Sequence, residues 1–452
     1  MDIDAREPRH VLGSALNRRR FLQLGVAGLG AAALSVGARA RASFAASPAV
    51  APAASDLPLL GGPEYPIGFF WPPPREFTTS ERYAEIAEAG FTWVLGVASI
   101  VDFPINDTML RLCEEHGLLG VPTDFRIYAI RDYPRDQWQE IFTTTLAEYR
   151  KYPAFAGLHL RDEPQPDWYP SMAEVMRMAR EQAPDVLFHT NAAPWHMGER
   201  LVEFVETIQP HLLSFDNYPL MRGRDNPGFF EQWGQVRELG LQYDLPTWVY
   251  IQSVATTNLR NPTPAELLWQ VNVSLAYGCK GIQYFTYWTP ESYSDLGPGG
   301  LITLEGERTE RYYAAKDINT QWLARVGRQL KPLTSETVAV ANLLADAPPG
   351  LPRFQPDGYV RESWGDPVIV SRFADPSDPD HRWLFVANYS HDDPSATRIN
   401  LGSLVRGRGV AKFNAATERF EEVPPPQKRL DVALAAGEAH LYRLPVRRSE
   451  GA

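Results

Sequence analysis

Short apolar runs alternate with helix-like segments from Tyr65 to Pro290. Each run is bounded by turn residues, and the segments between them have the periodicity of amphipathic helices. The runs are IGFFWPPP (67–74), FTWVLGV (91–97), LLGVPTD (118–124), AGLHLRDEP (156–164), VLFHTNAAP (186–194), LLSFDNYPL (212–220), TWVYIQSV (247–254) and GIQYFTYWTP (281–290). Eight strand–helix alternations over roughly 250 residues predict a (β/α)₈ TIM barrel, which we assign to residues 61–332.

The pattern changes after Leu333, where short alternating strands follow one another without helices. Turns rich in Pro, Asp and Gly separate them. This pattern predicts a β-sandwich over residues 333–447, so the fold class is α/β, a TIM barrel followed by a C-terminal β-sandwich. A doubly wound sheet is the alternative for the first part, but the sequence lacks the Gly-rich first turn with which that fold binds a phosphate. The predicted sandwich strands are TVAVANLL, PVIVSRFA, RWLFVANYS, ATRINL, GVAKFNAA, ERFEEV and AHLYRLPV.

The N-terminus has the layout of an export signal. A basic NRRRFLQ segment precedes the apolar LGVAGLGAAALSVG and the small-residue ARARA. We expect a twin-arginine signal peptide over residues 1–42 and an Ala/Pro/Ser-rich linker over residues 43–60. The apolar stretch is short for a membrane span, so we expect no membrane contact beyond the export signal. The mature protein is expected to be periplasmic or secreted in a bacterium.

Charge and cysteine content exclude several classes of partner. The net charge is −11, whereas nucleic acids and anionic membranes select basic patches, so no nucleic-acid partner is expected. The two cysteines, Cys113 and Cys279, lack the CxxC or Cys/His spacing of a zinc site. We expect two buried thiols, with a disulfide as the less favoured alternative, and neither a metal nor a cofactor. The sequence leaves the oligomeric state open.

Polar and aromatic residues gather where the predicted barrel strands end. A TIM barrel builds its active site at the carboxyl ends of its strands, so side chains there face the cleft. The fourth strand ends in Arg161, Asp162 and Glu163, and the sixth ends in Asp216. Aromatic side chains at such ends suit a cleft that stacks flat apolar faces, as sugar rings have. The substrate-binding candidates are Trp71, Asp124, Arg161, Asn191, Trp195, Tyr218, Gln252, Tyr287 and Trp288.

The segment AYGCKGIQYFTYWTP, followed by GLITLEGERTERYYAAKDINTQWLARVGRQL, resembles glycoside hydrolases related to the family 42 β-galactosidases. The resemblance implies a carbohydrate substrate, a proton-donating Glu at the end of strand four and a nucleophilic Glu at the end of strand seven. Glu163 stands at the first position, after Asp162, but Gln252 stands at the second. The implied function is hydrolysis of O-glycosyl bonds. The alternative is a carbohydrate-binding barrel that has lost its nucleophile.

Glycoside hydrolysis normally needs two carboxyl groups, one protonated and one ionised. Glu163 is the candidate general acid. Asp216 is the favoured partner, because two strands of separation admit a water between the groups, the inverting geometry of roughly 6.5–9.5 Å. Asp162 is the second possibility, because a paired Asp-Glu is similar to the substrate-assisted N-acetylhexosaminidases, in which the Asp orients an acetamido group. Asp124 is the third.

Each catalytic candidate also has a purely structural interpretation. Asp162 can pair with Arg161 or Arg126 and hold the loop after the strand. Asp216 can act as a turn former before a proline. Glu163 can cap the next helix, although Pro164 delays the start of that helix. The sequence does not decide between these interpretations and catalysis.

Overall fold

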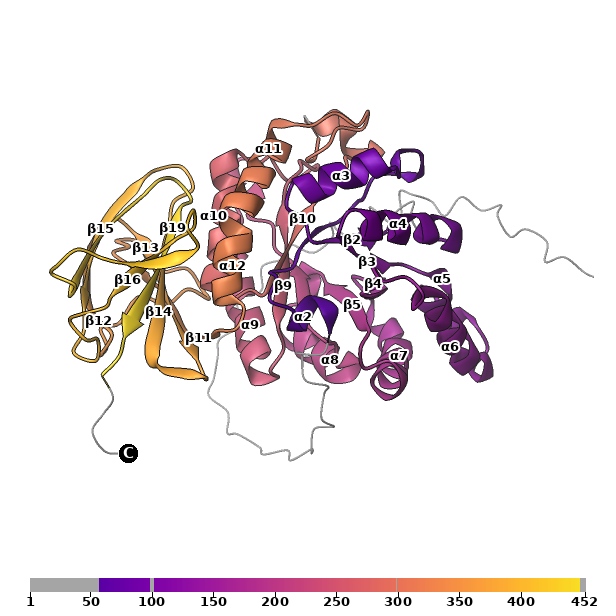
Figure 1. The fold of residues 1–452 in the computed structure, drawn as a ribbon, viewed down its shortest axis with the longest axis horizontal. Coiled ribbons are helices and arrows are strands. Elements are labelled where there is room, and N and C mark those ends of the chain that lie inside the picture. The colour runs from indigo at the N-terminus through magenta and orange to yellow at the C-terminus, as the bar shows by residue number, and fades with distance from the viewer. Residues whose placement is uncertain (1–56, 98–100, 298, 448–452) are drawn as a thin grey trace, which may run out of the picture. The chain divides into compact units, whose positions relative to one another are not determined.

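A computed structural model describes residues 57–97, 101–297 and 299–447 (Figure 1). The expected twin-arginine signal over residues 1–42 and all but the last four residues of the expected linker, 43–60, lie outside this part of the chain. Among the described residues, no helix combines the length and the apolar character that crossing a membrane requires. Cys113 and Cys279 are free thiols and both are buried, as the sequence predicted.

Eight parallel strands form the barrel. Six of them pair in the order β1-β10-β9-β6-β5-β4, and β2 pairs with β3. Bridges from Gly120 to Phe155 and from Thr123 to His159 join β3 to β4, and Thr92 N donates to Ile67 O at 2.8 Å beside β1 and β2. The predicted TIM barrel is confirmed. Its strands are β1 Ile67–Phe69, β2 Trp93–Gly96, β3 Leu119–Pro122, β4 Gly157–Asp162, β5 Leu187–Ala192, β6 Leu213–Asp216, β9 Thr247–Gln252 and β10 Gly281–Phe285.

Helices follow the barrel strands and cover the barrel (Figure 1). α10 begins at a capping box, in which Thr263 accepts from the Glu266 amide and the Glu266 carboxylate accepts from Thr263 N at 2.7 Å. The main helices are α3 Ser80–Glu88, α4 Phe103–Glu115, α6 Trp138–Tyr149, α7 Tyr169–Gln182, α8 Glu199–Ile208, α9 Phe229–Gln242 and α10 Pro264–Ala276. The last helical stretch is α11 Glu310–Asp317, the π-helical η8 Ile318–Leu323 and α12 Ala324–Leu330.

Shorter elements lie in the connections. They are α2 Pro58–Gly61, η2 Arg75–Phe77, α5 Phe125–Tyr128, η3 Ile130–Asp132, η4 Arg135–Gln137, η5 Pro166–Trp168, η6 Pro194–His196, the hairpin β7 Leu220–Met221 with β8 Arg224–Asp225, and η7 Glu291–Leu296. Four of them, η5, η6, the hairpin and η7, follow the carboxyl ends of β4, β5, β6 and β10. They therefore contribute to the face of the barrel where a TIM-barrel active site is built.

Alternate residues of each barrel strand face its interior, because side chains of a strand point in turn to opposite sides. On β9, Trp248 and Tyr250 pack inside the barrel, whereas Val249 and Ile251 join the outer core under the helices. The Trp93 and Trp248 rings lie 5.4 Å apart in this interior. A Cβ atom at Gly68 would lie only 2.3 Å from the Trp93 ring, so a glycine in β1 makes room for it.

The C-terminal strands form two antiparallel sheets, and the predicted β-sandwich is confirmed. One sheet has the order β11-β13-β14-β19-β16-β17 and the other has the order β12-β15-β18. Their facing side chains form a separate core that includes Leu384, Ile399 and Val432. The strands are β11 Thr334–Ala341, β12 Val360–Gly365, β13 Val368–Asp375, β14 Asp378–Asn388, β15 Ser395–Leu401, β16 Ala411–Asn414, β17 Arg419–Glu422, β18 Arg429–Leu434 and β19 Ala439–Pro445.

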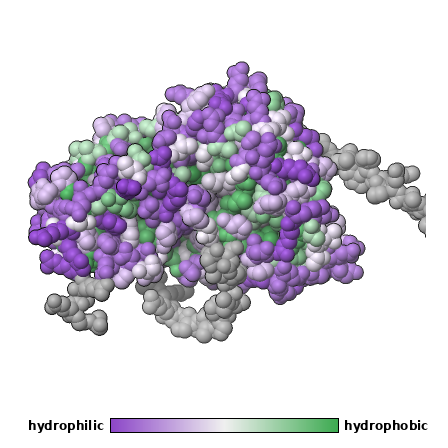
Figure 2. Space-filling view, in the orientation of Figure 1, coloured by the Kyte–Doolittle hydropathy of each residue, from purple (hydrophilic) through white to green (hydrophobic). Residues whose placement is uncertain are grey.

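The visible face of the molecule is mainly hydrophilic, with scattered apolar patches (Figure 2). Of the large apolar side chains in the described residues, few are strongly exposed. Leu344, Phe125 and Trp364 are among them, and Trp364 is 49% exposed on β12. Isolated apolar residues of this kind are normal on a folded surface.

Candidate active site

Three carboxyl groups meet at the carboxyl ends of β4 and β6. Asp162 is the last residue of β4, Glu163 follows it, and Asp216 is the last residue of β6. Glu163 and Asp216 form a hydrogen bond between their carboxyl groups. Asp216 is buried, whereas Asp162 and Glu163 are partly exposed. The fold thus brings together all three residues that the sequence indicated as catalytic candidates.

Asn191, at the end of β5 between the two acidic strands, connects the acids. Its Nδ2 donates to Asp216 Oδ1 at 2.7 Å, and its side chain also forms a hydrogen bond with Asp162. Its Oδ1 accepts from Ser214 Oγ at 2.7 Å, and that hydroxyl accepts from Gln283 Nε2 at 3.0 Å. Because Oδ1 is engaged by Ser214, Asn191 presents only N–H donors to the acids. Its donors stabilise negative charge on Asp162 and Asp216.

The backbone at Glu163 takes an uncommon conformation. Its φ is +42°, in the left-handed region that residues other than glycine rarely adopt. Its N–H donates to Asn191 O at 3.0 Å, which fixes the turn out of β4. Such conformations persist only where the surroundings enforce them, and they concentrate at functional sites.

His196, in η6, holds Pro164, the residue that follows Glu163 in the turn out of β4. Its Nδ1 accepts from Ala193 N at 2.9 Å, so the neutral ring carries its proton on Nε2, which lies 3.0 Å from Pro164 O. Burial lowers the pKa of His196 to about 4, which keeps the ring neutral. Trp195 is partly exposed and stacks on His196 with ring centroids 3.6 Å apart. The loop after β5 therefore positions Glu163 through Pro164.

Burial and neighbouring charges raise the pKa of all three acids. Burial, followed by the charge of Asp216, raises the pKa of Glu163 well above its usual value. Burial also raises the pKa of Asp216, to about 7, while hydrogen bonds from Glu163, Asn191 and Tyr218 act in the opposite direction. Burial and the charge of Glu163 raise the pKa of Asp162. In the hydrogen-bonded pair Glu163 is therefore the protonated member and Asp216 the one that ionises.

Three tyrosines surround the acids. Tyr218 forms a hydrogen bond with Asp216. Tyr250 points into the barrel beside Asp162 and Asp216, and its buried hydroxyl has no hydrogen-bond partner among the described residues. Tyr293, from η7, is partly exposed and close to Glu163 and Asp216. Burial and then the nearby negative charges raise the pKa of all three phenols, so they remain hydrogen-bond donors.

Partly exposed aromatic rings lie against the same end of the barrel. Trp71, Tyr218 and Phe285 pack on the barrel interior. The ring centroids of Tyr218 and Phe285 are 5.3 Å apart, and those of Phe285 and Tyr293 are 6.4 Å apart. The arrangement offers a proton donor, an ionisable carboxylate and phenolic donors beside flat apolar faces. It is suited to general acid catalysis on a polar substrate with apolar ring faces.

In sequence, the chain matches no family model and no curated protein. In structure, the β-galactosidase from Bacillus circulans sp. alkalophilus aligns with 84% of this chain and 99% of its own, at 10% identity and a TM-score of 0.54. The β-galactosidases from Marinomonas ef1 and Rahnella sp. R3 align with 59% and 62% of this chain, at 11% and 13% identity and TM-scores of 0.45 and 0.48. These structural neighbours are glycoside hydrolases.

This chain spans only 62% and 59% of the lengths of the Marinomonas and Rahnella enzymes. At these identities the likeness to the Bacillus enzyme establishes the fold, a TIM barrel followed by β-structure. It assigns no activity to individual residues.

Gln252, at the end of β9, is fully buried and engaged in the fold. Its Oε1 accepts from Leu220 N at 3.1 Å, and its Nε2 donates to Leu220 O at 3.2 Å and also to Arg260 O. The side chain thus joins the loops after β6 and β9. In this state it offers no free hydrogen-bonding group to a substrate.

Asp124 is engaged away from the other acids. It caps α5, and its carboxylate accepts from Arg126 Nε at 2.9 Å, from Arg126 Nη2 at 2.8 Å and from the Tyr149 hydroxyl at 2.8 Å. Asp124 and Arg126, together with Phe125 and Glu148, line a hollow of about 330 Å³. The structure does not bring Asp124 into contact with Glu163.

Two further substrate-binding candidates face α3 rather than the acids. The Tyr287 hydroxyl donates to Glu85 Oε1 at 3.0 Å, and the buried Trp288 ring lies 4.7 Å from Phe77 with the Arg82 guanidinium 5.5 Å from it. Both side chains therefore stabilise the contact between α3 and the segment that follows β10.

Arg161 also contacts groups other than the acids. Its Nη1 donates to Tyr128 O at 3.1 Å, and its guanidinium lies 3.3 Å from the Trp168 ring centroid. Arg131 lies 3.2 Å from the same centroid. Cation–π contacts of this kind fix the loop between β4 and α7.

Within the described part of the chain, one group of side chains has the spacing of metal ligands. Ligand atoms of Glu266, His391 and Asp392 lie within 4.8 Å of one another. Arg260 already pairs with Glu266, and His391 Nε2 lies 2.8 Å from Asp225 Oδ2. Glu266 and His391 are therefore already engaged by side chains of the protein.

Sequence reasoning missed His196, Tyr250 and Tyr293. Strand alternation offers a signal for Tyr250, since it precedes Gln252 by two residues and points to the same face of β9. His196 and Tyr293 lie in loops, and their proximity to Glu163 depends on tertiary structure that no local pattern encodes.

Proposed function

We propose that this protein is an exported glycoside hydrolase that cleaves O-glycosyl bonds of an oligosaccharide or polysaccharide. The observation that carries the proposal is the hydrogen-bonded pair of Glu163 and Asp216, in which burial keeps a proton on Glu163. The pair lies at the catalytic end of a TIM barrel, beside partly exposed aromatic rings. The fold shared with β-galactosidases supports a carbohydrate as the substrate.

Glu163 acts as the general acid in this proposal. Its raised pKa lets it reach a glycosidic oxygen still protonated at neutral pH and transfer the proton as the bond breaks. In the free protein the proton lies between Glu163 and Asp216, so an arriving glycosidic oxygen displaces Asp216 as the acceptor. Asp216 is then free as the ionised group that the reaction requires.

The contact between the two acids bears on the stereochemistry. A direct hydrogen bond leaves no water between Glu163 and Asp216, and it brings them closer than the roughly 6.5–9.5 Å of inverting enzymes. Retaining enzymes place their two carboxyl groups closer together, roughly 5–5.5 Å apart, with no water between them. We therefore favour Asp216 as the group that meets the anomeric carbon, with retention of configuration, over the water-activating role that the strand separation suggested.

A second route through the same acids uses Asp162. Asn191 forms a hydrogen bond with Asp162, the residue before Glu163, and the Tyr250 hydroxyl, which has no partner among the described residues, lies near Asp162. These groups match the needs of a substrate-assisted reaction, in which protein groups hold an acetamido substituent while Glu163 protonates the leaving oxygen. A substrate that carries a 2-acetamido group would distinguish this route from attack by Asp216.

The second candidate function is carbohydrate binding without catalysis. It is favoured by Gln252, which occupies the strand-seven end with an amide engaged in loop contacts. If the barrel only binds, the acids serve as hydrogen-bonding groups for sugar hydroxyls.

Export is part of the proposal because of the NRRRFLQ segment and the apolar stretch after it. Replacing the arginine pair Arg18 and Arg19 by lysines should retain the protein in the cytoplasm, as fractionation and immunoblotting would show. Unchanged recovery from the periplasm or medium would contradict twin-arginine export.

Hydrolysis is tested by incubating the protein with aryl glycosides and neutral polysaccharides and by measuring released sugars. We expect E163Q to lower the turnover of an unactivated substrate by roughly 10²–10⁴-fold. E181Q, on the exposed surface of α7, is the matched control and should retain the wild-type rate. Tight binding of an oligosaccharide with no product from the wild-type protein would favour the binding function instead.

A further inference from the structure

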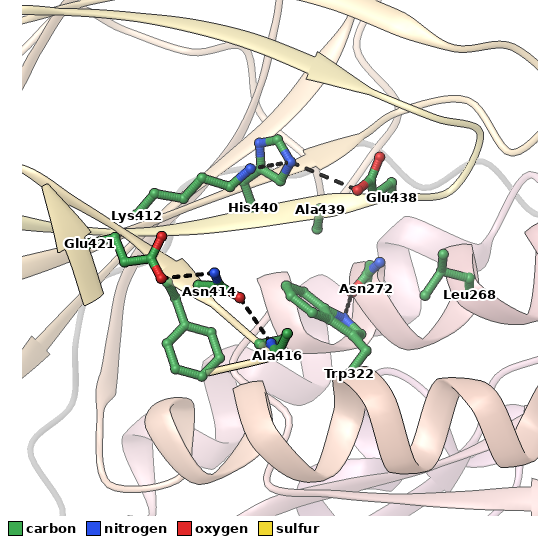
Figure 3. A pocket seen from close by; sticks show the side chains of 12 residues that line it. Leu268, Asn272, Trp322, Lys412, Asn414, Ala416, Glu421, Glu438, Ala439 and His440 are labelled. Atoms are coloured by element: carbon green, nitrogen blue, oxygen red, sulfur yellow. Dashed lines mark hydrogen bonds and ion pairs between the residues drawn. The ribbon is translucent and has the colours of Figure 1, made fainter. Parts of the chain in front are cut away.

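A cleft of about 520 Å³ lies between the outer helices of the barrel and the β-sandwich (Figure 3). Its lining residues do not include Asp162, Glu163 or Asp216. Its volume lies within the roughly 300–1,000 Å³ that small-molecule sites occupy. Its aromatic and polar lining includes Asn272 of α10, Trp322 of η8, Lys412 and Asn414 of β16, Glu421 of β17 and His440 of β19.

Trp322 provides a partly exposed, flat apolar face in this cleft. Its Nε1 donates to Asn272 Oδ1 at 2.7 Å, and the buried Asn272 donates from Nδ2 to Gly437 O at 2.8 Å. These bonds fix the polar edge of the indole and leave its face for another group. Trp322 also lies in the π-helical turn η8, a type of irregularity that occurs often at functional sites.

Polar side chains from the sandwich border the same space. Lys412 Nζ lies 2.8 Å from His440 Nε2, and Glu438 Oε1 lies 3.8 Å from that same nitrogen. Asn414 Nδ2 donates to Glu421 Oε1 at 2.8 Å. These contacts hold the side chains in place while further lone pairs and protons remain for a ligand.

The charge balance indicates a neutral ligand. Lys412 is the cationic side chain among the lining residues, and Glu421 and Glu438 oppose it. A phosphate or a carboxylate would therefore meet two like charges, whereas hydroxyl groups can donate to the carboxylates and accept from Lys412. A flat apolar face bordered by such groups is complementary to a pyranose ring.

We propose that this cleft is an accessory carbohydrate site that binds a neutral sugar unit against the face of Trp322. It binds glycan without acting on it, because Glu163 and Asp216 do not line it. It places the β-sandwich in contact with the polysaccharide and does not depend on hydrolysis by the barrel.

Affinity electrophoresis in native gels that contain β-1,4-galactan, β-1,4-mannan, xyloglucan or mixed-linkage β-glucan tests the site. The E163Q protein is used so that the polysaccharide stays intact. Adding W322A should weaken retardation by at least one of these polysaccharides roughly tenfold. W364A, which removes an exposed Trp from β12, is the matched control and should leave retardation unchanged.

A second variant guards against a folding defect in W322A. E421A changes an exposed side chain that pairs with Asn414, and it should also weaken retardation by the same polysaccharide. Equal retardation of the W322A, E421A and W364A proteins would overturn the proposal. Dextran sulfate serves as an anionic probe, and retardation by it but by none of the four neutral polysaccharides would overturn the proposal as well.

The two proposals fail separately. With Glu163 intact, W322A should leave the turnover of a small aryl glycoside at the wild-type rate. If W322A loses polysaccharide binding while E163Q turns over substrate normally, the accessory site is supported and Glu163 is rejected as the general acid.

Discussion

The carboxyl groups of Glu163 and Asp216 are hydrogen-bonded to each other across the carboxyl ends of β4 and β6. Two desolvated carboxyl groups in contact cannot both ionise at low energetic cost, so one proton is held between them. This relationship determines how activity and stability should respond to pH and to substitution.

The pH profile of kcat/KM should be bell-shaped. Asp216 must be ionised, and its pKa is raised to about 7, so the rate should fall as the pH decreases below about 7. Glu163 must be protonated, and its raised pKa places the alkaline limb far above the usual range of a glutamic acid. Initial rates on an unactivated glycoside between pH 4 and pH 10 measure both limbs. A rate that is flat from pH 4 to pH 8 would reject the ionisation of Asp216.

D216N should stabilise the folded protein above neutral pH. An unfolded Asp ionises near 3.8 and the folded Asp216 near 7, so the folded state binds the extra proton between these values. Wild-type stability therefore falls as the pH rises through this window, and an asparagine avoids that loss. At pH 8 the Tm of D216N should exceed that of the wild type by at least roughly 2–4 °C, with a smaller gap at pH 4. D185N, on the exposed surface, should show no such change with pH.

Y250F should impair activity without destabilising the fold. The Tyr250 hydroxyl is buried and has no partner in the described structure, so removing it takes away an unsatisfied polar group. We expect an unchanged or higher Tm and kcat/KM lower by roughly 10-fold or more, because the hydroxyl is left to bind substrate. Y287F is the contrast, since it removes a hydrogen bond to Glu85 and should lower Tm at nearly normal kcat/KM. A Y250F enzyme with wild-type kinetics would remove Tyr250 from the site.

Q252E should destabilise the protein and should not raise its activity. The Gln252 amide donates to the carbonyls of Leu220 and Arg260, and a carboxylate there would face two acceptors without a proton. We expect a loss of about 2–4 kcal/mol in unfolding free energy by urea denaturation at pH 8. Q182E, at the exposed end of α7, is the control. A stable Q252E variant with increased turnover would instead indicate a vacant nucleophile position.

The sequence predicted the architecture because its signals are local. Apolar runs of strand length indicate strands without tertiary context. A capping box such as that of Thr263 and Glu266 likewise marks the start of a helix, here α10. The strand β12, with residues VRESWG, was not predicted, because its buried and exposed positions do not alternate regularly. The strand β18 was also missed, although RLDVAL alternates well, because the prolines before it read as a turn.

The candidate site was predictable only in part. Strand ends brought Asp162, Glu163 and Asp216 together, since the carboxyl ends of parallel barrel strands share one face. Position along the chain did not reveal that Gln252 binds loop carbonyls or that Tyr287 faces α3. Those outcomes depend on side-chain direction after the strand has ended, where the period of two no longer applies.

Proton donation by Glu163 is tested by how the activity of E163Q depends on the leaving group, because a general acid matters only where the departing oxygen needs a proton. Kinetics are compared for glycosides of one sugar with a 2,4-dinitrophenyl or a methyl leaving group. We predict that E163Q hydrolyses the dinitrophenyl glycoside within about tenfold of the wild-type rate and loses roughly 10²–10⁴-fold on the methyl glycoside. Equal losses on the two substrates, or none on either, would contradict proton donation by Glu163.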